Sequence, residues 1–221
     1  MDTPARQLLV LGAGPGLGLA VARRFGEEGY AAALVGGSEE KMQPLVEDLA
    51  AAGIRATAHG VALDNPDDVA RVVTEVGAAA GRIDVLHFNP SAWREAGPLQ
   101  LSVAQLFEDL AVGAAPLLPA VQAARSFLHA GARVLVTGSA AADTPSPAAA
   151  SLGVQKAAVR NLVTSLDAVL APSGVRAVCV QVNGVLRTEG FTPPEVAEAL
   201  YAAAARSDDG WTAQVSYDGA A

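Results

Sequence analysis

The segment from residue 7 to residue 18 reads Gln7-Leu8-Leu9-Val10-Leu11-Gly12-Ala13-Gly14-Pro15-Gly16-Leu17-Gly18. Its apolar half is typical of a strand that is buried on both faces. The glycines that follow permit a tight turn and let backbone amides approach a phosphate group. A helix that begins at Gly16 adds the partial positive charge of its N-terminus. The segment therefore predicts a strand–turn–helix unit that can cradle a phosphate.

Short β-branched runs alternate with longer helical patterns along the rest of the chain. This alternation indicates a parallel sheet with right-handed crossovers, in a doubly wound α/β fold. Pro116 and Pro119 each remove a backbone donor, so we expect a kink or break in the fourth helix. The predicted strands are Gln7–Gly12, Ala31–Val35, Arg55–Gly60, Asp84–Phe88, Arg133–Thr137, Val175–Val182 and Trp211–Tyr217. The predicted helices are Gly16–Glu28, Glu39–Ala52, Pro66–Ala80, Ser102–Ala130, Ala149–Ala171 and Pro194–Arg206.

Composition narrows the class of protein. The 221 residues are 51% hydrophobic and carry a net charge of −8, which favours one acidic globular domain over 1–221 and disfavours binding to nucleic acid or to an anionic membrane. The stretch Met1–Arg6 does not resemble a signal peptide, and no apolar run reaches the ~20 residues of a membrane span. Cys179 is the only cysteine, so no internal disulfide forms, and we expect it in a buried strand. No metal site is predicted, and the expected location is cytoplasmic.

Several motifs resemble those of the short-chain dehydrogenase/reductase (SDR) family. The spacing Gly12-x-x-x-Gly16-x-Gly18 resembles the family's glycine turn, and Ser151-Leu152-Gly153-Val154-Gln155-Lys156 resembles its Tyr-x-x-x-Lys helix. Leu152 takes the place of the tyrosine. The resemblance extends over essentially the whole chain and implies a single-domain Rossmann fold. It also implies a seven-stranded parallel sheet of order 3-2-1-4-5-6-7, flanked by helices.

The resemblance implies binding of NAD or NADP. The family's ribose-selecting acid or arginine falls at Gly36, Gly37 or Pro15, and its adenine-side aspartate falls at Val61, so the adenosine end has lost its polar contacts. For the glycine turn, the alternative is that it is inherited from a cofactor-binding ancestor and now binds nothing. For Asn89, the alternative is that it only forms hydrogen bonds with the local backbone. The implied cofactor-binding residues are Gly12, Pro15, Gly16, Leu17, Gly18, Ser38, Asn89, Lys156 and Thr188.

The implied catalytic residues are Ser139 and Lys156. Lys156 is one of only two lysines in the chain, yet it stands at the family's lysine position; the alternative is an ordinary surface lysine. In the family this lysine holds the nicotinamide ribose and lowers the pKa of the tyrosine. Ala111 takes the place of the catalytic asparagine. We expect Leu152 to face the cofactor cleft one helical turn before Lys156, with Ser139 beside it.

The missing tyrosine leaves the reaction open. We expect a divergent NAD(P)-binding SDR enzyme with altered or weak carbonyl/alcohol redox activity. Ser151, Asp143 or Glu189 could replace the tyrosine as the proton donor, and nothing in the sequence singles one of them out. The alternatives are a non-redox lyase, isomerase or cyclase that reuses the cleft, and a catalytically silent pseudoenzyme. The expected partners are a small-molecule substrate and further copies of the chain, since the family pairs its fourth and fifth helices into homodimers or homotetramers. The loop Trp93-Arg94-Glu95 either covers the site or carries solvated charges.

Overall fold

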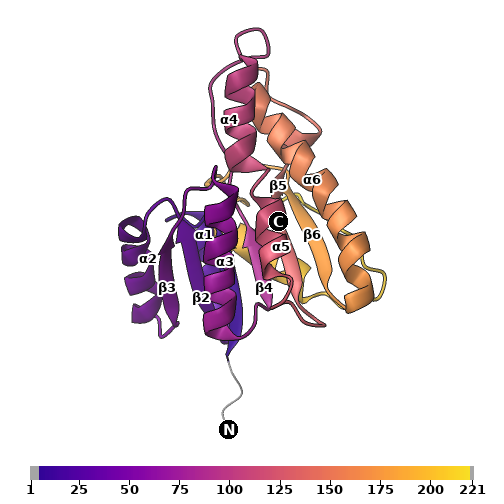
Figure 1. Cartoon of the computed structure of the whole chain (residues 1–221). Coiled ribbons are helices and arrows are strands. Elements are labelled where there is room, and N and C mark those ends of the chain that lie inside the picture. Colours follow the sequence, from indigo (N-terminus) through magenta and orange to yellow (C-terminus); the bar gives the residue numbers. More distant parts are fainter. Residues whose placement is uncertain (1–4, 220–221) are drawn as a thin grey trace.

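The computed structural model describes residues 5–219, so most of the stretch Met1–Arg6 discussed above lies outside the described residues. Seven parallel strands form one sheet of order β3-β2-β1-β4-β5-β6-β7, which confirms the predicted topology (Figure 1). The chain is one doubly wound α/β unit in which the strand order reverses beside β1. The strands are β1 Arg6–Leu11, β2 Tyr30–Gly36, β3 Ala56–Gly60, β4 Val85–Phe88, β5 Arg133–Ser139, β6 Arg176–Val182 and β7 Gln214–Tyr217.

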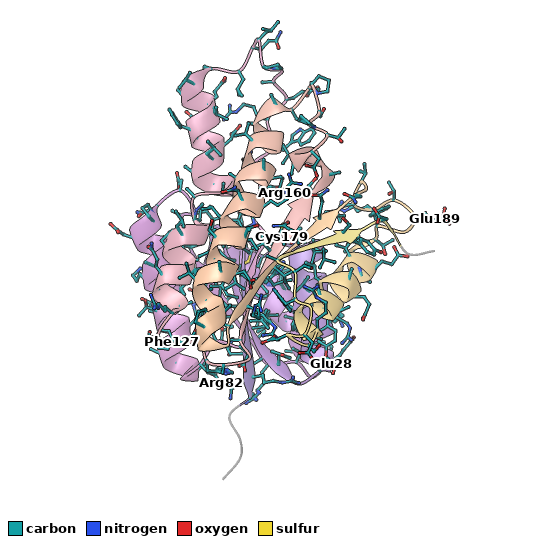
Figure 2. The ribbon with its side chains drawn as sticks, turned by 90° about the vertical axis from the view of Figure 1, so that its right-hand side faces the viewer. Glu28, Arg82, Phe127, Arg160, Cys179 and Glu189 are labelled. Carbon is teal, nitrogen blue, oxygen red and sulfur yellow. The ribbon has the colours of Figure 1, made fainter. Side chains whose placement is uncertain are left out.

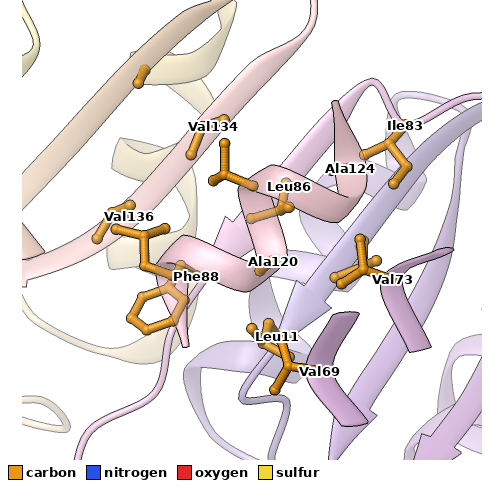
Figure 3. Packing of buried hydrophobic residues seen from close by; sticks show 14 of the residues in the cluster. Leu11, Val69, Val73, Ile83, Leu86, Phe88, Ala120, Ala124, Val134 and Val136 are labelled. Atoms are coloured by element: carbon orange, nitrogen blue, oxygen red, sulfur yellow. The ribbon is translucent and has the colours of Figure 1, made fainter. Parts of the chain in front are cut away.

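Helices cover both faces of the sheet, and each face has its own hydrophobic cluster. Side chains of α3, α5 and α6 cover one face, where Leu11, Leu86 and Val136 pack against Val69, Val73 and Ala120 (Figure 3). Side chains of α1, α2 and α7 cover the other face. The helices are α1 Leu17–Glu27, α2 Glu39–Ala51, α3 Pro66–Ala80, α4 Val103–Gly113, α5 Leu117–Ala124, α6 Ala150–Leu170 and α7 Pro193–Ala205, with short 3₁₀ turns η1 Ala140–Ala142 and η2 Ala171–Ser173.

The predicted break in the fourth helix is present. Pro116 is the N-cap of α5, and Pro119 lies in the first turn of α5, where a missing N–H costs no intrahelical bond. The predicted extent to Ala130 is wrong, because α5 ends at Ala124. Phe127 turns inward instead and lies against α3, where a Cβ on Gly77 would come within 2.2 Å of its ring. A tertiary contact therefore ends this helix, which local sequence does not reveal.

The first half of α6 and all of α4 extend past the carboxyl ends of the strands (Figure 1). Ligands of doubly wound sheets bind in the crevice outside those strand ends. The two helices thus stand beside the edge of the sheet where a site is expected. No helix of the described residues is long and apolar enough to span a membrane.

Candidate functional site

The turn between β1 and α1 requires glycine at two places. Gly12 has φ of +81°, and a Cβ there would lie 2.7 Å from the backbone nitrogen of Pro90. A Cβ on Gly18 would lie 2.9 Å from Cα of Ala13, where the turn folds back on the helix. Any larger residue would push β1, the turn and the loop after β4 apart. Packing of this turn therefore requires glycine at positions 12 and 18.

The same turn is open towards solvent and is suited to an anion. A Cβ on Gly14 would meet no atom within 4 Å, and one on Gly16 would meet only the Arg187 guanidinium, at 3.7 Å. The first turn of α1 contains no acidic residue, and no side chain caps its N-terminus. Free helix-terminal amides and the helix dipole attract phosphate groups. The residues present thus fit the pyrophosphate of a dinucleotide.

A cavity of ≈ 290 Å³ lies at the carboxyl ends of β4, β5 and β6. We call it the strand-end cavity. It brings together Leu17, Asn89, Ser139, Leu152 and Lys156, which the sequence placed in one site. Leu152 and Lys156 lie one helical turn apart on α6. The full lining is Leu17, Asn89, Ser91, Thr137, Gly138, Ser139, Leu152, Lys156, Val182, Gly184 and Leu186.

Lys156 is buried, with 6% of its surface exposed. Its Nζ donates hydrogen bonds to the carbonyl oxygens of Thr137, at 3.1 Å, and Pro90, at 3.3 Å. Burial disfavours the charged form and lowers the pKa of Lys156 to about 8. This lysine is no surface residue, and its burial favours the neutral amine more than in an ordinary exposed lysine.

A buried polar chain connects the strand ends to the glycine turn. The Thr137 hydroxyl donates to Oδ1 of Asn89 at 2.9 Å, and Nδ2 of Asn89 donates to the Gly12 carbonyl oxygen at 3.1 Å. Because the single hydroxyl proton of Thr137 is used, Nε2 of His87 is the donor in its 2.9 Å bond to Thr137 Oγ1. Burial, together with the charge of Lys156, lowers the pKa of His87 to about 3, so its imidazole is neutral. Asn89 thereby braces the loop after β4 against the turn.

Ser139 lies at the end of β5 and caps η1. Its Oγ accepts a hydrogen bond from the Ala141 amide at 3.2 Å. On the opposite side, the side-chain amide of Gln155 pairs with both backbone groups of Ala92, at 2.9 and 3.0 Å. These bonds fix the two loops that border the strand-end cavity.

Six of the nine predicted cofactor residues lie outside the strand-end cavity. Gly12, Pro15, Gly16 and Gly18 belong to the glycine turn, and Ser38 and Thr188 lie in other loops. Thr188 is exposed and donates to the Val185 carbonyl oxygen at 2.7 Å. Ser38 caps α2, with its Oγ accepting from the Lys41 amide at 3.3 Å. Ser38 follows the end of β2, on the other side of the glycine turn, where the adenosine end of a dinucleotide lies in such folds.

At the expected adenosine end of the cofactor site, two adjacent glycines differ in the space that is free beside them. A Cβ on Gly36 would meet Sδ of Met42 at 2.8 Å, so Met42 fills the place of an acidic side chain. A Cβ on Gly37 would meet nothing within 4 Å. Packing against Met42 therefore leaves no room for a polar side chain at position 36, whereas position 37 has room for one.

None of the three acids considered from the sequence lines the strand-end cavity. Ser151 lies in the first turn of α6 and is fully buried. Asp143 forms an ion pair with Arg160 and accepts from Gln181 at 3.0 Å. Glu189 is exposed at the outer edge of the loop after β6, whereas Cys179 lies in the interior (Figure 2). The expectation that one of these three donates the proton has no geometric support.

The loop Trp93-Arg94-Glu95 is anchored to α4. Arg94 binds the buried carboxylate of Asp109 through two nitrogens, at 2.9 Å each, and Glu108 at 3.0 Å. The guanidinium beside it holds the pKa of Asp109 below its usual value. Arg94 is therefore a structural clamp and not a solvated charge, while Trp93 is exposed.

Sequence reasoning missed Thr137, His87 and Gln155. Thr137 and His87 are polar residues that interrupt otherwise apolar strands. A polar residue in a buried strand indicates a buried hydrogen bond, and this was the signal in the sequence. Gln155 carried no signal, since its partner Ala92 is 63 residues away and bonds through its backbone.

The doubly wound sheet and its glycine turn place the molecule in the Rossmann class of α/β proteins. Residues 6–195 match the family model described as short chain dehydrogenase, so the chain belongs to that family. Glucose 1-dehydrogenase of Gluconobacter oxydans (strain 621H) is 31% identical over 188 residues, which span 82% of this chain and 70% of that protein. A short chain dehydrogenase of Pseudocercospora fijiensis (strain CIRAD86) is 27% identical over 172 residues, which span 76% of this chain and 55% of that protein.

Solved structures share the fold. A short chain dehydrogenase from Burkholderia cenocepacia J2315, in complex with NADP, has a TM-score of 0.87 and 25% identity over 97% of this chain and 96% of that one. A metagenomic short-chain oxidoreductase, also in complex with NADP, has a TM-score of 0.84 and 27% identity over 95% of each chain.

Proposed function

We propose that this protein is an NAD(P)-binding oxidoreductase that interconverts a small carbonyl compound and its alcohol, with altered proton delivery. The observation that carries the proposal is the open glycine turn beside a cavity that Lys156 and Ser139 both line. Two of the solved relatives contain NADP. A bound nicotinamide cofactor supplies the hydride acceptor or donor.

The residues of this chain would divide the binding between them. The turn from Gly12 to Gly18 holds the pyrophosphate through backbone amides. Asn89 holds the nicotinamide half, and Lys156 and Ser139 face the substrate oxygen. Thr188 reaches the nicotinamide only if the loop after β6 moves inward, because it now bonds within its own loop.

Leu152 and Ala111 stand where the family resemblance implies a catalytic tyrosine and a catalytic asparagine. A positioned general acid contributes roughly 10²–10⁴ in rate, so we propose weak activity on generic ketones. If no cofactor binds, the alternatives are a non-redox lyase, isomerase or cyclase that reuses the cleft, and a catalytically silent pseudoenzyme. The proposed partner is a small-molecule substrate, and the proposed location is the cytoplasm.

Calorimetric titration with NAD⁺, NADH, NADP⁺ and NADPH tests the proposal. We expect binding of at least one form, and a weakening of about 10-fold or more in Gly14→Asp, because the new carboxylate faces the pyrophosphate. Gly14 has open space around it, so this change leaves the fold intact. Gln122→Glu adds the same charge on an exposed position of α5 and is the matched control. Absence of binding by all four forms at millimolar concentration would reject the proposal.

A further inference from the structure

We propose that Lys156 is itself the proton donor and acceptor of the strand-end cavity, taking over the role of the tyrosine whose place in the Tyr-x-x-x-Lys pattern is occupied by Leu152. The inference rests on the proposed function and names the residue that delivers its proton. The relatives' lysine acts through the tyrosine. Here no phenol stands between the amine and a ligand.

Lys156 has no competitor within the cavity. Of the eleven described residues that line it, only Lys156 has an acidic or basic side chain; the rest are apolar, hydroxyl, amide or glycine residues. The acids suggested by the sequence face elsewhere: Asp143 is paired with Arg160, and Glu189 is exposed on the loop after β6. Any side chain that gives a proton to a bound oxygen by changing its own charge must therefore be Lys156.

The two hydrogen bonds of Nζ orient the amine. An ammonium group has three donors, and the carbonyl oxygens of Thr137 and Pro90 accept two of them. The third position remains for the cavity that the side chain lines. After this proton leaves, the neutral amine keeps both carbonyl bonds and carries its lone pair at the third position. Both protonation states thus satisfy the same two carbonyls, which lowers the cost of switching between them.

The surroundings allow the switch near neutral pH. Two titratable groups face Lys156 from the sheet, namely His87 on β4 and Cys179 on β6. Burial keeps His87 neutral, and burial raises the pKa of Cys179 to about 11, so neither is charged at pH 7. Among residues 5–219, no carboxylate lines the cavity to hold the ammonium form. Burial therefore dominates and brings the pKa of Lys156 to about 8, which suits a group that must both give and take a proton.

The proton balance is simple. In reduction, a bound nicotinamide cofactor would supply the hydride that the carbonyl carbon takes up. The Nζ ammonium then gives one proton to the oxygen, which becomes a hydroxyl, and the neutral amine regains a proton from water. In oxidation the neutral amine takes the hydroxyl proton. Leu152, Leu186 and Val182 line the same cavity and limit water around the amine.

Nuclear magnetic resonance of the whole protein tests the amine without any cofactor. The chain has two lysines, so lysine labelled at Cε and Nζ gives two side-chain signals, and Lys41→Arg assigns them. We expect Lys156 to titrate with a midpoint of about 8, well below Lys41. A midpoint for Lys156 above about 10, the ordinary lysine value, would overturn the proposal whether or not a cofactor binds.

Kinetics with saturating cofactor test the chemistry. Reduction of a ketone panel should fall as pH rises through the measured Lys156 midpoint, and alcohol oxidation should rise through it. Lys156→Met should lower kcat by roughly 10²–10⁴, and Lys156→Arg should do the same, because arginine stays protonated. If Lys156→Arg keeps wild-type kcat, or if both pH profiles are flat through the midpoint, Lys156 only positions the ligand and the proposal is wrong. If calorimetry finds no cofactor binding, the redox function fails while the resonance titration still decides the state of the amine.

Discussion

At the scale of a single residue, Leu152 is where this chain departs from the Tyr-x-x-x-Lys pattern that its sequence resembles. Leu152 and Lys156 line one cavity from successive turns of α6, so a side chain at 152 lies within reach of the amine. A tyrosine there would place a phenol beside Nζ. The cavity of ≈ 290 Å³ accommodates the larger ring.

Leu152→Tyr should therefore raise the reduction of generic ketones or quinones by NADH or NADPH. We expect a gain of about 10-fold or more, within the roughly 10²–10⁴ that a positioned acid contributes. Steady-state assays that follow cofactor absorbance measure it. Leu152→Phe fills the same space without a hydroxyl and should show no gain. No gain in Leu152→Tyr, with cofactor binding established, would indicate that Ala111 is the limiting defect.

Gly37 offers a second test at the scale of a residue, because it has free space for a side chain and the adjacent Gly36 has none. Gly37→Arg places a guanidinium at the end of β2 without a clash, and we expect it to tighten binding of NADP(H) over NAD(H) by about 10-fold through the 2′-phosphate. Gly36→Asp should instead destabilise the fold, since its Cβ would lie 2.8 Å from Sδ of Met42. Calorimetry for the first variant and thermal unfolding for both would measure these effects. Equal affinity of Gly37→Arg for both cofactors would place the adenosine elsewhere.

At the scale of elements, the end of α4 packs closely against α6 at Gly113. A Cβ on Gly113 would lie 1.8 Å from Oε1 of Gln155, the same oxygen that accepts from the Ala92 amide. Gln155 is fully buried, so it has little room to yield. The loop after β4, which carries Asn89 and Ser91 into the cavity, depends on this arrangement.

Gly113→Ala should therefore lower the free energy of unfolding by about 1–3 kcal/mol, the usual cost of overpacking. That cost exceeds the roughly 0.5–1 kcal/mol that alanine gains over glycine within a helix. Cofactor affinity should fall with it, because Ala92 loses its partner. Urea unfolding and calorimetry measure the two effects. Gly37→Ala, which meets no atom within 4 Å, is the control and should be neutral; a neutral Gly113→Ala would show that Gln155 moves aside freely.

Local patterns predicted most elements, and long-range contacts explain the misses. The apolar run Leu8–Leu11, the glycine turn and Pro116 act within a few residues, so the sheet, the turn and the helix break were predictable. The early end of α5 depends on Phe127 reaching Gly77, and the clamp of the loop after β4 depends on Arg94 reaching Asp109. In the site, Lys156 and Leu152 were found from a motif. The exclusion of Asp143 became visible only when its pairing with Arg160 was known.

At the scale of the whole molecule, α4 and the first half of α6 stand apart from the helices that cover the sheet (Figure 1). This projecting pair exposes large apolar side chains. Phe107 and Val103 on α4 are 64% and 69% exposed, and Val154 on α6 is 44% exposed. Exposed apolar groups gathered on neighbouring elements are typical of protein–protein contact surfaces.

We expect these helices to pair with a second copy across a two-fold axis, which gives a homodimer or homotetramer. Light scattering at micromolar concentration should then report about two or four times the chain mass of 22.3 kDa. Phe107→Glu should shift the mass towards the monomer, because a carboxylate would be desolvated in the contact. Val185→Glu is the matched control, since Val185 is 73% exposed on the loop after β6 and not on these helices. A mass near 22.3 kDa for the wild type would contradict the pairing, and α4 would then be a lone projection whose apolar face serves another partner.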